Sequence, residues 1–265
     1  MVHVCKNCNK EFIGHYCNYC GQSADTHKIN YNYLWHEIQH GLFHLDKGII
    51  YTTKELFTRP GHTIKEYIAG KRVKHFKPVA YVLVLATIYA LLAHVLKIET
   101  VFDEMSVGLE KVEEAKSNEF LKTLKGSFDW LKEHYAYTTL FLLPLISFSS
   151  YLAFRKSKYN YIEHLILNTY IAGQRIIVFI LVLPLLALAK SEQMLSNIGN
   201  LETILWVSLM TWTYIQFFDN NTIFRNLLKT IKCFIYLGVQ LLLLIIIVTI
   251  ILGVAYGKNG LTIKI

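Results

Sequence analysis

The sequence predicts an all-α polytopic membrane protein with about five transmembrane helices, a small N-terminal four-cysteine zinc ribbon and amphipathic interfacial helices. The chain of 265 residues is 53% hydrophobic and only 17% charged, which is too apolar for an ordinary soluble domain of this size. Long apolar runs recur after residue 78, and all cysteines but one lie near the N-terminus. We therefore expect a ribbon at 1–22, an amphipathic and basic interfacial region at 23–77, and a transmembrane helical bundle at 78–265.

Two close cysteine pairs near the N-terminus predict a metal site formed by Cys5, Cys8, Cys17 and Cys20. Such pairs, joined by a short hairpin, can place four thiolates at the corners of a tetrahedron, the closed geometry of structural zinc. Iron uses the same ligands and stays open as an alternative. A disulfide framework would require an oxidising compartment, whereas we expect this end of the chain in the reducing cytoplasm. Four sulfur ligands leave no position for water, so we expect a folding role for the metal and no catalysis.

Three histidines at four-residue spacing follow the ribbon, on a helix expected from residue 31 to 45. Its apolar residues fall within one arc, and His36, His40 and His44 stack along the opposite, polar side. The histidines could form a second metal site or a pH-sensitive site. The alternative is a membrane-surface helix whose polar face is rich in histidine.

A basic collar is expected just before the first transmembrane helix, after a turn and a short helix that follow residue 56. Basic side chains at a membrane surface are each attracted to anionic headgroups by about 1 kcal/mol. The collar is therefore either a plain topology anchor or a specific headgroup or substrate pocket. Its members are Arg59, Lys71, Arg72, Lys74 and Lys77.

Five apolar segments are expected to cross the membrane, because roughly 20 helical residues span a hydrocarbon core of about 30 Å. They lie at about 79–96, 138–154, 168–189, 204–218 and 234–256. The fourth is short and rich in aromatic residues, which favour the headgroup region, so its ends are the least defined. Residues 97–137 carry mixed charge and are expected to form an external amphipathic loop.

The distribution of lysine and arginine predicts the orientation. With the N-terminus inside, the inner segments hold nearly twice as many of these residues as the outer ones, as the positive-inside rule requires. This distribution predicts a multi-pass protein of a bacterial inner (cytoplasmic) membrane, with a cytoplasmic N-terminus and an external C-terminus.

A few polar side chains fall within the predicted spans, and such groups are functional hypotheses by default because they are expensive in hydrocarbon. They are Gln174, Arg175 and, near a span end, His94. Arg175 is expected either to reach the headgroups or to pair with Glu163 or Asp219. The remaining cysteine, Cys233, is expected to be a small packing residue. No phosphate-binding loop, zinc-protease helix or serine nucleophile motif is present, so no catalytic residue is assigned.

Several motifs of the first 90 residues resemble a known family. These are the paired cysteines with Gly21 and Gln22, the stretch 45–48, the turn at 56–61 and the stretch 66–72. Together they resemble DUF3667, a family of membrane proteins of unknown function found mainly in Bacteroidota. The resemblance implies a ribbon and a basic collar but no activity. A weaker, architectural likeness links the five expected spans to Yip1-like membrane proteins, which are associated with membrane trafficking or organisation.

The expected function is that of a non-enzymatic adaptor or membrane-organising protein. In this hypothesis the ribbon docks a cytoplasmic protein partner, while the bundle and collar engage a bilayer with anionic headgroups. The alternative is a transporter or lipid-moving protein whose polar path includes Arg175, His94 and the proline-broken spans. A membrane enzyme acting through the histidines is a third possibility. Nucleic acid is not an expected partner, because headgroup phosphates already compete for the basic residues. Homo-oligomerisation stays open.

Overall fold

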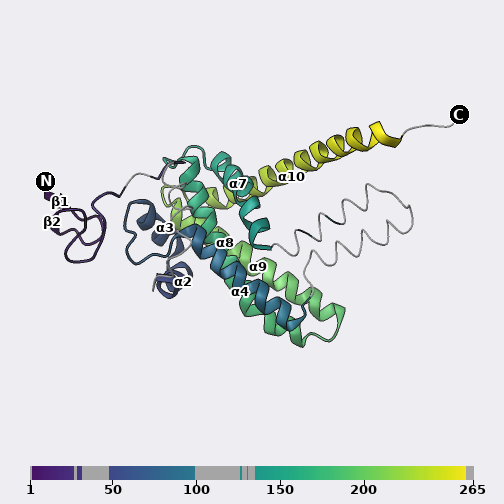
Figure 1. The fold of residues 1–265 in the computed structure, drawn as a ribbon, viewed down its shortest axis with the longest axis horizontal. Coiled ribbons are helices and arrows are strands. Elements are labelled where there is room, and N and C mark those ends of the chain that lie inside the picture. The colour runs from purple at the N-terminus through teal and green to yellow at the C-terminus, as the bar shows by residue number, and fades with distance from the viewer. Residues whose placement is uncertain are drawn as a thin grey trace.

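The structure is a computed structural model that describes residues 2–26, 29–31, 48–98, 126, 130 and 135–260. The described chain is mostly helical, with one small hairpin at its N-terminal end (Figure 1). Nearly all of the expected external loop lies outside the described residues. The same holds for His36, His40 and His44, so the expected histidine site stays a prediction.

The ribbon is built on a two-stranded antiparallel hairpin of β1 (Val2–Val4) and β2 (Glu11–Ile13). Val2 pairs with Ile13 and Val4 with Glu11. An isolated bridge between Tyr16 and Ser23 closes the second half of the ribbon. Phe12 is 5% exposed and packs against Cys5 and Cys17, so the ribbon's small core consists mainly of this ring and the cysteines.

Two short helices, α2 (Gly48–Thr58) and α3 (Pro60–Ile68), form a unit between the ribbon and the bundle. Pro60 occupies the first turn of α3, where a missing backbone N–H costs little. Gly70 ends the unit with a φ of +105°, a conformation that favours glycine. The following turn leads to Pro78, which begins α4. The turn, short helix and basic stretch expected before the first span thus appear as two helices and a loop.

The bundle contains α4 (Pro78–Leu96), α7 (Tyr135–Ala153), α8 (Tyr161–Leu188), α9 (Glu192–Phe217) and α10 (Ile223–Gly260). Helix α8 lies at its centre and packs against α4, α7 and α9 (Figure 1). Asn160 and Glu163 form a capping box at the start of α8. The helix therefore begins at residue 161, and the interfacial lead-in expected before residue 168 is continuous with it.

Three helices among the described residues are long and apolar enough to cross a membrane: Pro78–Leu96, Tyr161–Leu188 and Ile223–Val248. A shorter apolar stretch, Thr139–Ala153, lies in α7. Helix α9 starts at residue 192, not near 204, and its first half carries the charged residues Glu192 and Glu202. Three apolar helices are compatible with a membrane protein. Five crossings are not confirmed and stay a prediction.

Helix α10 differs from the others in how little of it is covered. Only 6% of its apolar window is buried, and its C-terminal part extends away from the remaining helices (Figure 1). Leu242, Ile245 and Ile250 are all more than half exposed. Lipid would cover such a surface in a membrane protein.

Candidate metal centre

The four N-terminal cysteines lie together at the base of the ribbon. Their sulfur atoms are all within 4.8 Å of one another. Cys5 Sγ lies 3.5 Å from Cys20 Sγ, and Cys8 Sγ lies 3.6 Å from Cys17 Sγ. All five cysteines of the chain are free thiols. The structure thus assembles all four predicted ligands into one cluster.

Each of the two cysteine pairs lies in its own backbone loop, and the two loops have the same geometry. Asn9 N–H donates to Cys5 C=O and Gly21 N–H donates to Cys17 C=O, both at 2.8 Å. These loops require a left-handed residue after the second cysteine, and Asn9 and Gly21 have φ values of +58° and +76°. Asparagine and glycine are the residues that adopt this conformation most readily. The two halves of the cluster are therefore built alike by local sequence.

The donor set fits a tetrahedral metal ion. Metal–sulfur bonds of about 2.3 Å give a tetrahedron whose edges are about 3.8 Å, close to the Cys5–Cys20 and Cys8–Cys17 sulfur separations of 3.5 and 3.6 Å. Zinc and iron both accept four thiolates. Once bound, such an ion cross-links the two loops and supplies folding energy that the small ribbon core lacks.

One thiol of the cluster ionises easily. Burial disfavours the Cys20 thiolate, but hydrogen bonds from the Asn7 side chain and the Gln22 backbone lower the pKa of Cys20 to about 6. A thiolate, not a thiol, is the ligand of a metal ion. The hydrogen bonds around Cys20 thus favour the form of this side chain that a metal ion binds.

The ribbon is attached to the α2–α3 unit by specific contacts. Arg72 N–H, in the turn after α3, donates to Gln22 Oε1 at 3.1 Å. Within the N-terminal segment, Lys6 Nζ donates to Thr26 C=O at 3.0 Å, which holds the Lys6 side chain in place. A Cβ atom added to Gly70 would lie 2.9 Å from Lys6 Cδ, so the Lys6 stem rests directly on this glycine. The metal centre is consequently held in a fixed place against the helices.

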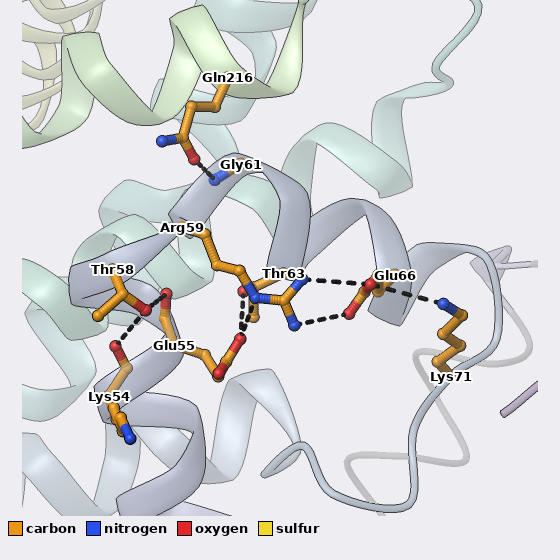
Figure 2. A network of polar contacts seen from close by, with 9 residues as sticks. All are labelled: Lys54, Glu55, Thr58, Arg59, Gly61, Thr63, Glu66, Lys71 and Gln216. Carbon is orange, nitrogen blue, oxygen red and sulfur yellow. Dashed lines mark hydrogen bonds and ion pairs between the residues drawn. The ribbon is translucent and has the colours of Figure 1, made fainter. Parts of the chain in front are cut away.

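A polar network organises the α2–α3 unit (Figure 2). Arg59 donates to Glu55 through Nε and to both carboxylate oxygens of Glu66, at 3.3 and 3.1 Å. Thr63 donates to Glu55 and Lys71 pairs with Glu66, at 3.4 and 3.5 Å. The fork of arginine suits such a two-carboxylate arrangement. We call these five residues the α2–α3 network.

The hydrogen bonds and charges of the α2–α3 network shift the pKa values of Arg59 and Glu66. The hydrogen bonds of Glu66, then those of Glu55, raise the pKa of Arg59 above its ordinary value. Burial alone would raise the pKa of Glu66, but the hydrogen bonds and charge of Arg59, helped by Lys71, lower it. Both groups are therefore charged at neutral pH, and their pairing fixes the angle between α2 and α3.

The α2–α3 unit is also fastened to the far part of the bundle. Gly61 N–H donates to Gln216 Oε1 at 3.1 Å (Figure 2). Lys65 Nζ lies 2.6 Å from Asp219 Oδ2, and this pairing lowers the pKa of Asp219. The α2–α3 unit thus contacts α9 and the loop that follows it.

The five basic collar residues have different environments. Arg59 and Lys71 belong to the α2–α3 network. Arg72 donates through Nε to Tyr67 C=O and lies over the Tyr67 ring. Lys74 Nζ lies 5.9 Å from the centre of the Tyr51 ring, and Lys77 directly precedes α4 without a side-chain capping hydrogen bond. Their expected contact with headgroups stays a prediction.

The predicted intramembrane polar residues are dispersed. Gln174 is buried, donates to Leu56 C=O at 2.6 Å and accepts from Thr213 at 3.2 Å. The guanidinium of Arg175 lies between the rings of Phe179 and Trp206, at 4.7 and 4.6 Å. Cation–π contacts of this kind stabilise a cation away from water. His94 is exposed near the end of α4.

The two carboxylates expected as partners of Arg175 bind elsewhere. Glu163 accepts from the backbone N–H of Asn160 at 2.8 Å in the α8 cap, and Asp219 pairs with Lys65. Capping by Asn160 was visible as an Asn-x-x-Glu pattern before an apolar run. The pairing of Lys65 with Asp219 could not be predicted, because the two residues lie far apart in the sequence and no local pattern links them.

A buried polar chain inside the bundle was not expected from the sequence. Tyr214 donates to Asn168 at 2.7 Å, and Asn168 donates to Ser150 at 2.8 Å. Ser150 Oγ lies 3.0 Å from His164 Nδ1. These residues come from three helices, so only the tertiary structure brings them together. Buried polar groups that satisfy one another fix the mutual register of helices.

The fold and the cysteine cluster define a class: a mostly helical protein with apolar helices of membrane-spanning length and a four-cysteine site able to hold a metal ion. Residues 46–90 match the family described as Protein of unknown function (DUF3667), which confirms the family resemblance found in the sequence. The matched segment contains α2, α3, the whole α2–α3 network and the first part of α4. No curated protein and no solved structure matches the chain.

Proposed function

We propose that this protein is a non-enzymatic adaptor of a bacterial cytoplasmic membrane. In this proposal a zinc ion holds the ribbon, the ribbon docks a cytoplasmic partner protein, and the helices anchor the assembly in the bilayer. The N-terminus then lies in the cytoplasm and the C-terminus outside.

The observation that carries the proposal is an apolar strip on the outer face of the hairpin. Side chains alternate along a strand, so Phe12 points to the cysteines while Val2, Val4 and Ile13 point away. These three residues, the apolar strip, are 63%, 64% and 71% exposed. Large exposed apolar side chains gathered on so small a domain are typical of a protein-binding surface.

The attachment of the ribbon supports the same proposal. The contacts of Gln22 with Arg72 and of Lys6 with Gly70 hold one side of the ribbon against the helices. A fixed ribbon presents its strip in one orientation, and preorganisation of this kind lowers the entropic cost of binding. In the described part of the chain no third strand pairs with the hairpin, so an extended segment of a partner could add to its edge.

A photo-crosslinking amino acid at Ile13, in intact membranes, tests the proposal. We expect a discrete protein adduct that disappears when Val4→Glu interrupts the strip and when Cys17→Ser removes a metal ligand. The control position is Ile50, which is 79% exposed but lies on α2. Adducts with lipid alone, or the same adducts from Ile13 and Ile50, would contradict the proposal.

A further inference from the structure

A cleft of about 550 Å³ separates the ribbon from the α2–α3 unit. Its volume is typical of small-ligand sites. One wall comes from the ribbon and the other from α2, α3 and the turn before α4. We call it the ribbon cleft; its polar lining includes Asn7, Tyr19, Tyr51, Lys71, Lys74 and His75.

His75 is the feature of the ribbon cleft that the fold does not explain. Its side chain is 9% exposed, and neither ring nitrogen has a well-formed hydrogen bond with any described residue; the Lys71 backbone makes only a minor interaction with the ring. Tyr51 and Tyr67 contact the ring edge-on, at 5.4 and 6.1 Å between centroids. Buried polar groups are nearly always hydrogen-bonded. A missing partner in the wall of a cleft therefore indicates a ligand.

The protonation state of His75 determines which hydrogen bonds its ring can form with a ligand. Burial lowers the pKa of His75, against the attraction of Glu66 and Glu55. The ring is thus neutral at neutral pH and carries one N–H donor. It can hold an acceptor oxygen without placing an uncompensated charge in the wall.

The charges around the ribbon cleft favour an anion. Glu66 is the only carboxylate among the residues that line it, and Arg59 binds both of its oxygens. Lys74 has an aromatic ring as its neighbour, so its ammonium is available to a ligand. A metal bound to four thiolates makes the ribbon wall more negative, and two of these thiolates, Cys8 and Cys20, line the cleft. A further cation lies at this wall, because Lys10 Nζ is 4.0 Å from the centre of the ring of Tyr19, another lining residue.

The position of the cleft indicates where the anion comes from. Lys74 and His75 lie in the turn just before Lys77 and Pro78, where α4 begins; among the described residues α4 is the first helix long and apolar enough to cross a membrane. The start of such a helix lies at the depth of the lipid phosphates. We propose that the ribbon cleft binds a phosphate group of an anionic lipid headgroup, with Lys74 and Lys71 as cations and His75 and Asn7 as hydrogen-bond donors.

This inference goes beyond the proposed adaptor role, because it concerns a different face of the ribbon and needs no partner protein. Calorimetry on the purified, metal-loaded full chain in a neutral detergent tests it. The probes are short-chain phosphatidic acid, short-chain phosphatidylcholine as the headgroup control, and inorganic phosphate as the soluble source. We expect phosphatidic acid to bind at least about tenfold more tightly than phosphatidylcholine.

Matched variants locate the site. Lys74→Glu is expected to weaken phosphatidic acid binding by about tenfold or more, whereas Lys54→Glu, the same change at an exposed position of α2 outside the lining and outside the basic collar, is expected to have an effect of less than about threefold. His75→Phe keeps an aromatic ring and removes the donor, so it is expected to weaken binding by roughly fivefold.

Three results would overturn the assignment: equal affinity for the two lipids without binding of inorganic phosphate, equal losses in Lys74→Glu and Lys54→Glu, or unchanged affinity in both Lys74→Glu and His75→Phe. If inorganic phosphate binds as tightly as phosphatidic acid, the phosphate site stands and its ligand is a soluble phosphate. A failure of the crosslinking at Ile13 leaves all of these outcomes unaffected.

Discussion

At the scale of single residues, Gly61 sets how closely α3 approaches α9. A Cβ atom at this position would lie 2.4 Å from both Gln216 Cβ and the backbone nitrogen of Phe217. Because the second of these atoms belongs to the backbone, a small shift of a side chain cannot relieve the overlap. The glycine is required here by space and not by its φ angle.

Gly61→Ala is therefore expected to destabilise the protein by about 2 kcal/mol or more, since overpacking at a tight contact forces the backbone apart. Thermal unfolding in detergent, followed by tryptophan fluorescence, measures the change in Tm. Gly199→Ala is the control, because no atom lies within 4 Å of the added Cβ and alanine favours a helix. Equal melting temperatures for both variants would show that α3 does not pack on α9 as described.

The Arg59–Glu66 pair predicts a pH dependence. The pKa of Glu66 is lowered in the folded protein from an ordinary value of 4.5. Its contribution to stability is hence fully present well above pH 4.5 and is lost as the pH falls through the folded pKa. Glu66→Gln is expected to cost about 1 kcal/mol at pH 7, because a partly exposed pair is screened by solvent.

Melting curves of wild type and Glu66→Gln between pH 7 and pH 3 measure this dependence. The difference in Tm should be constant near neutrality and should shrink in acid. Glu11→Gln removes an exposed carboxylate of β2 and serves as the control for general charge effects. A difference that stays constant down to pH 3 would rule out Glu66 as the titrating group.

At the scale of elements, the ribbon depends on its metal ion more than on its core. Only three side chains form its buried cluster, and two of them are the ligands Cys5 and Cys17. A core of this size cannot offset the chain entropy of about 25 residues. Metal removal is therefore expected to unfold the ribbon while the bundle persists.

Hydrogen exchange with and without a chelator tests this expectation. Amides of residues 2–24 should lose protection, the turn at 70–75 should follow because Gln22 no longer holds Arg72, and α8 should be unchanged. Elemental analysis should find about one metal ion per chain in wild type and in Cys233→Ser, and far less in Cys17→Ser. It also identifies the metal. A protected ribbon in the presence of chelator would contradict the metal-dependent fold.

The elements differ in how far sequence alone predicts them. The two cysteine loops were predictable because ligand spacing and the residues Asn9 and Gly21 are local signals. The apolar runs likewise predicted α4, α8 and α10. The contact between Gln22 and Arg72 could not be predicted, because it joins a ribbon loop to a turn 50 positions away. The same limit applies to His75, whose missing partners appear only when Tyr51 and Tyr67 enclose it.

Helix α9 shows that hydropathy alone does not predict where a helix starts or whether it crosses the membrane. Its aromatic second half predicted a short span, but the helix begins earlier, at Glu192. Ser191 caps its N-terminus, where the Ser191 side chain accepts a hydrogen bond from Met194 N–H. A polar first half and an apolar second half give no clear assignment to lipid or water. Topology must therefore be measured.

At the scale of the whole molecule, two arrangements of the helices differ in a testable way. Five crossings place residue 156 inside the cell and residue 190 outside, whereas crossings by α4, α8 and α10 alone place them on the reverse sides. We expect five, because the basic residues near 156 then lie in the cytoplasm.

Lys156→Cys and Lys190→Cys, both at exposed positions, provide the measurement with a membrane-impermeant maleimide on intact cells. The predicted outcome is labelling of Lys190→Cys alone. Labelling of Lys156→Cys alone indicates three crossings. Recovery of the wild-type protein in the aqueous fraction after carbonate washing would remove the membrane assignment altogether.

The hydrogen bond between Gly61 and Gln216 spans 155 positions of the chain, and this has a consequence for biosynthesis. During translation α3 leaves the ribosome long before α9 exists, so the nascent α3 carries an uncovered notch while most of the bundle is still being made. Chains that stop early keep this notch open. Closure of the notch thus requires synthesis as far as the end of α9, which distinguishes chains that contain α9 from fragments that stop before it.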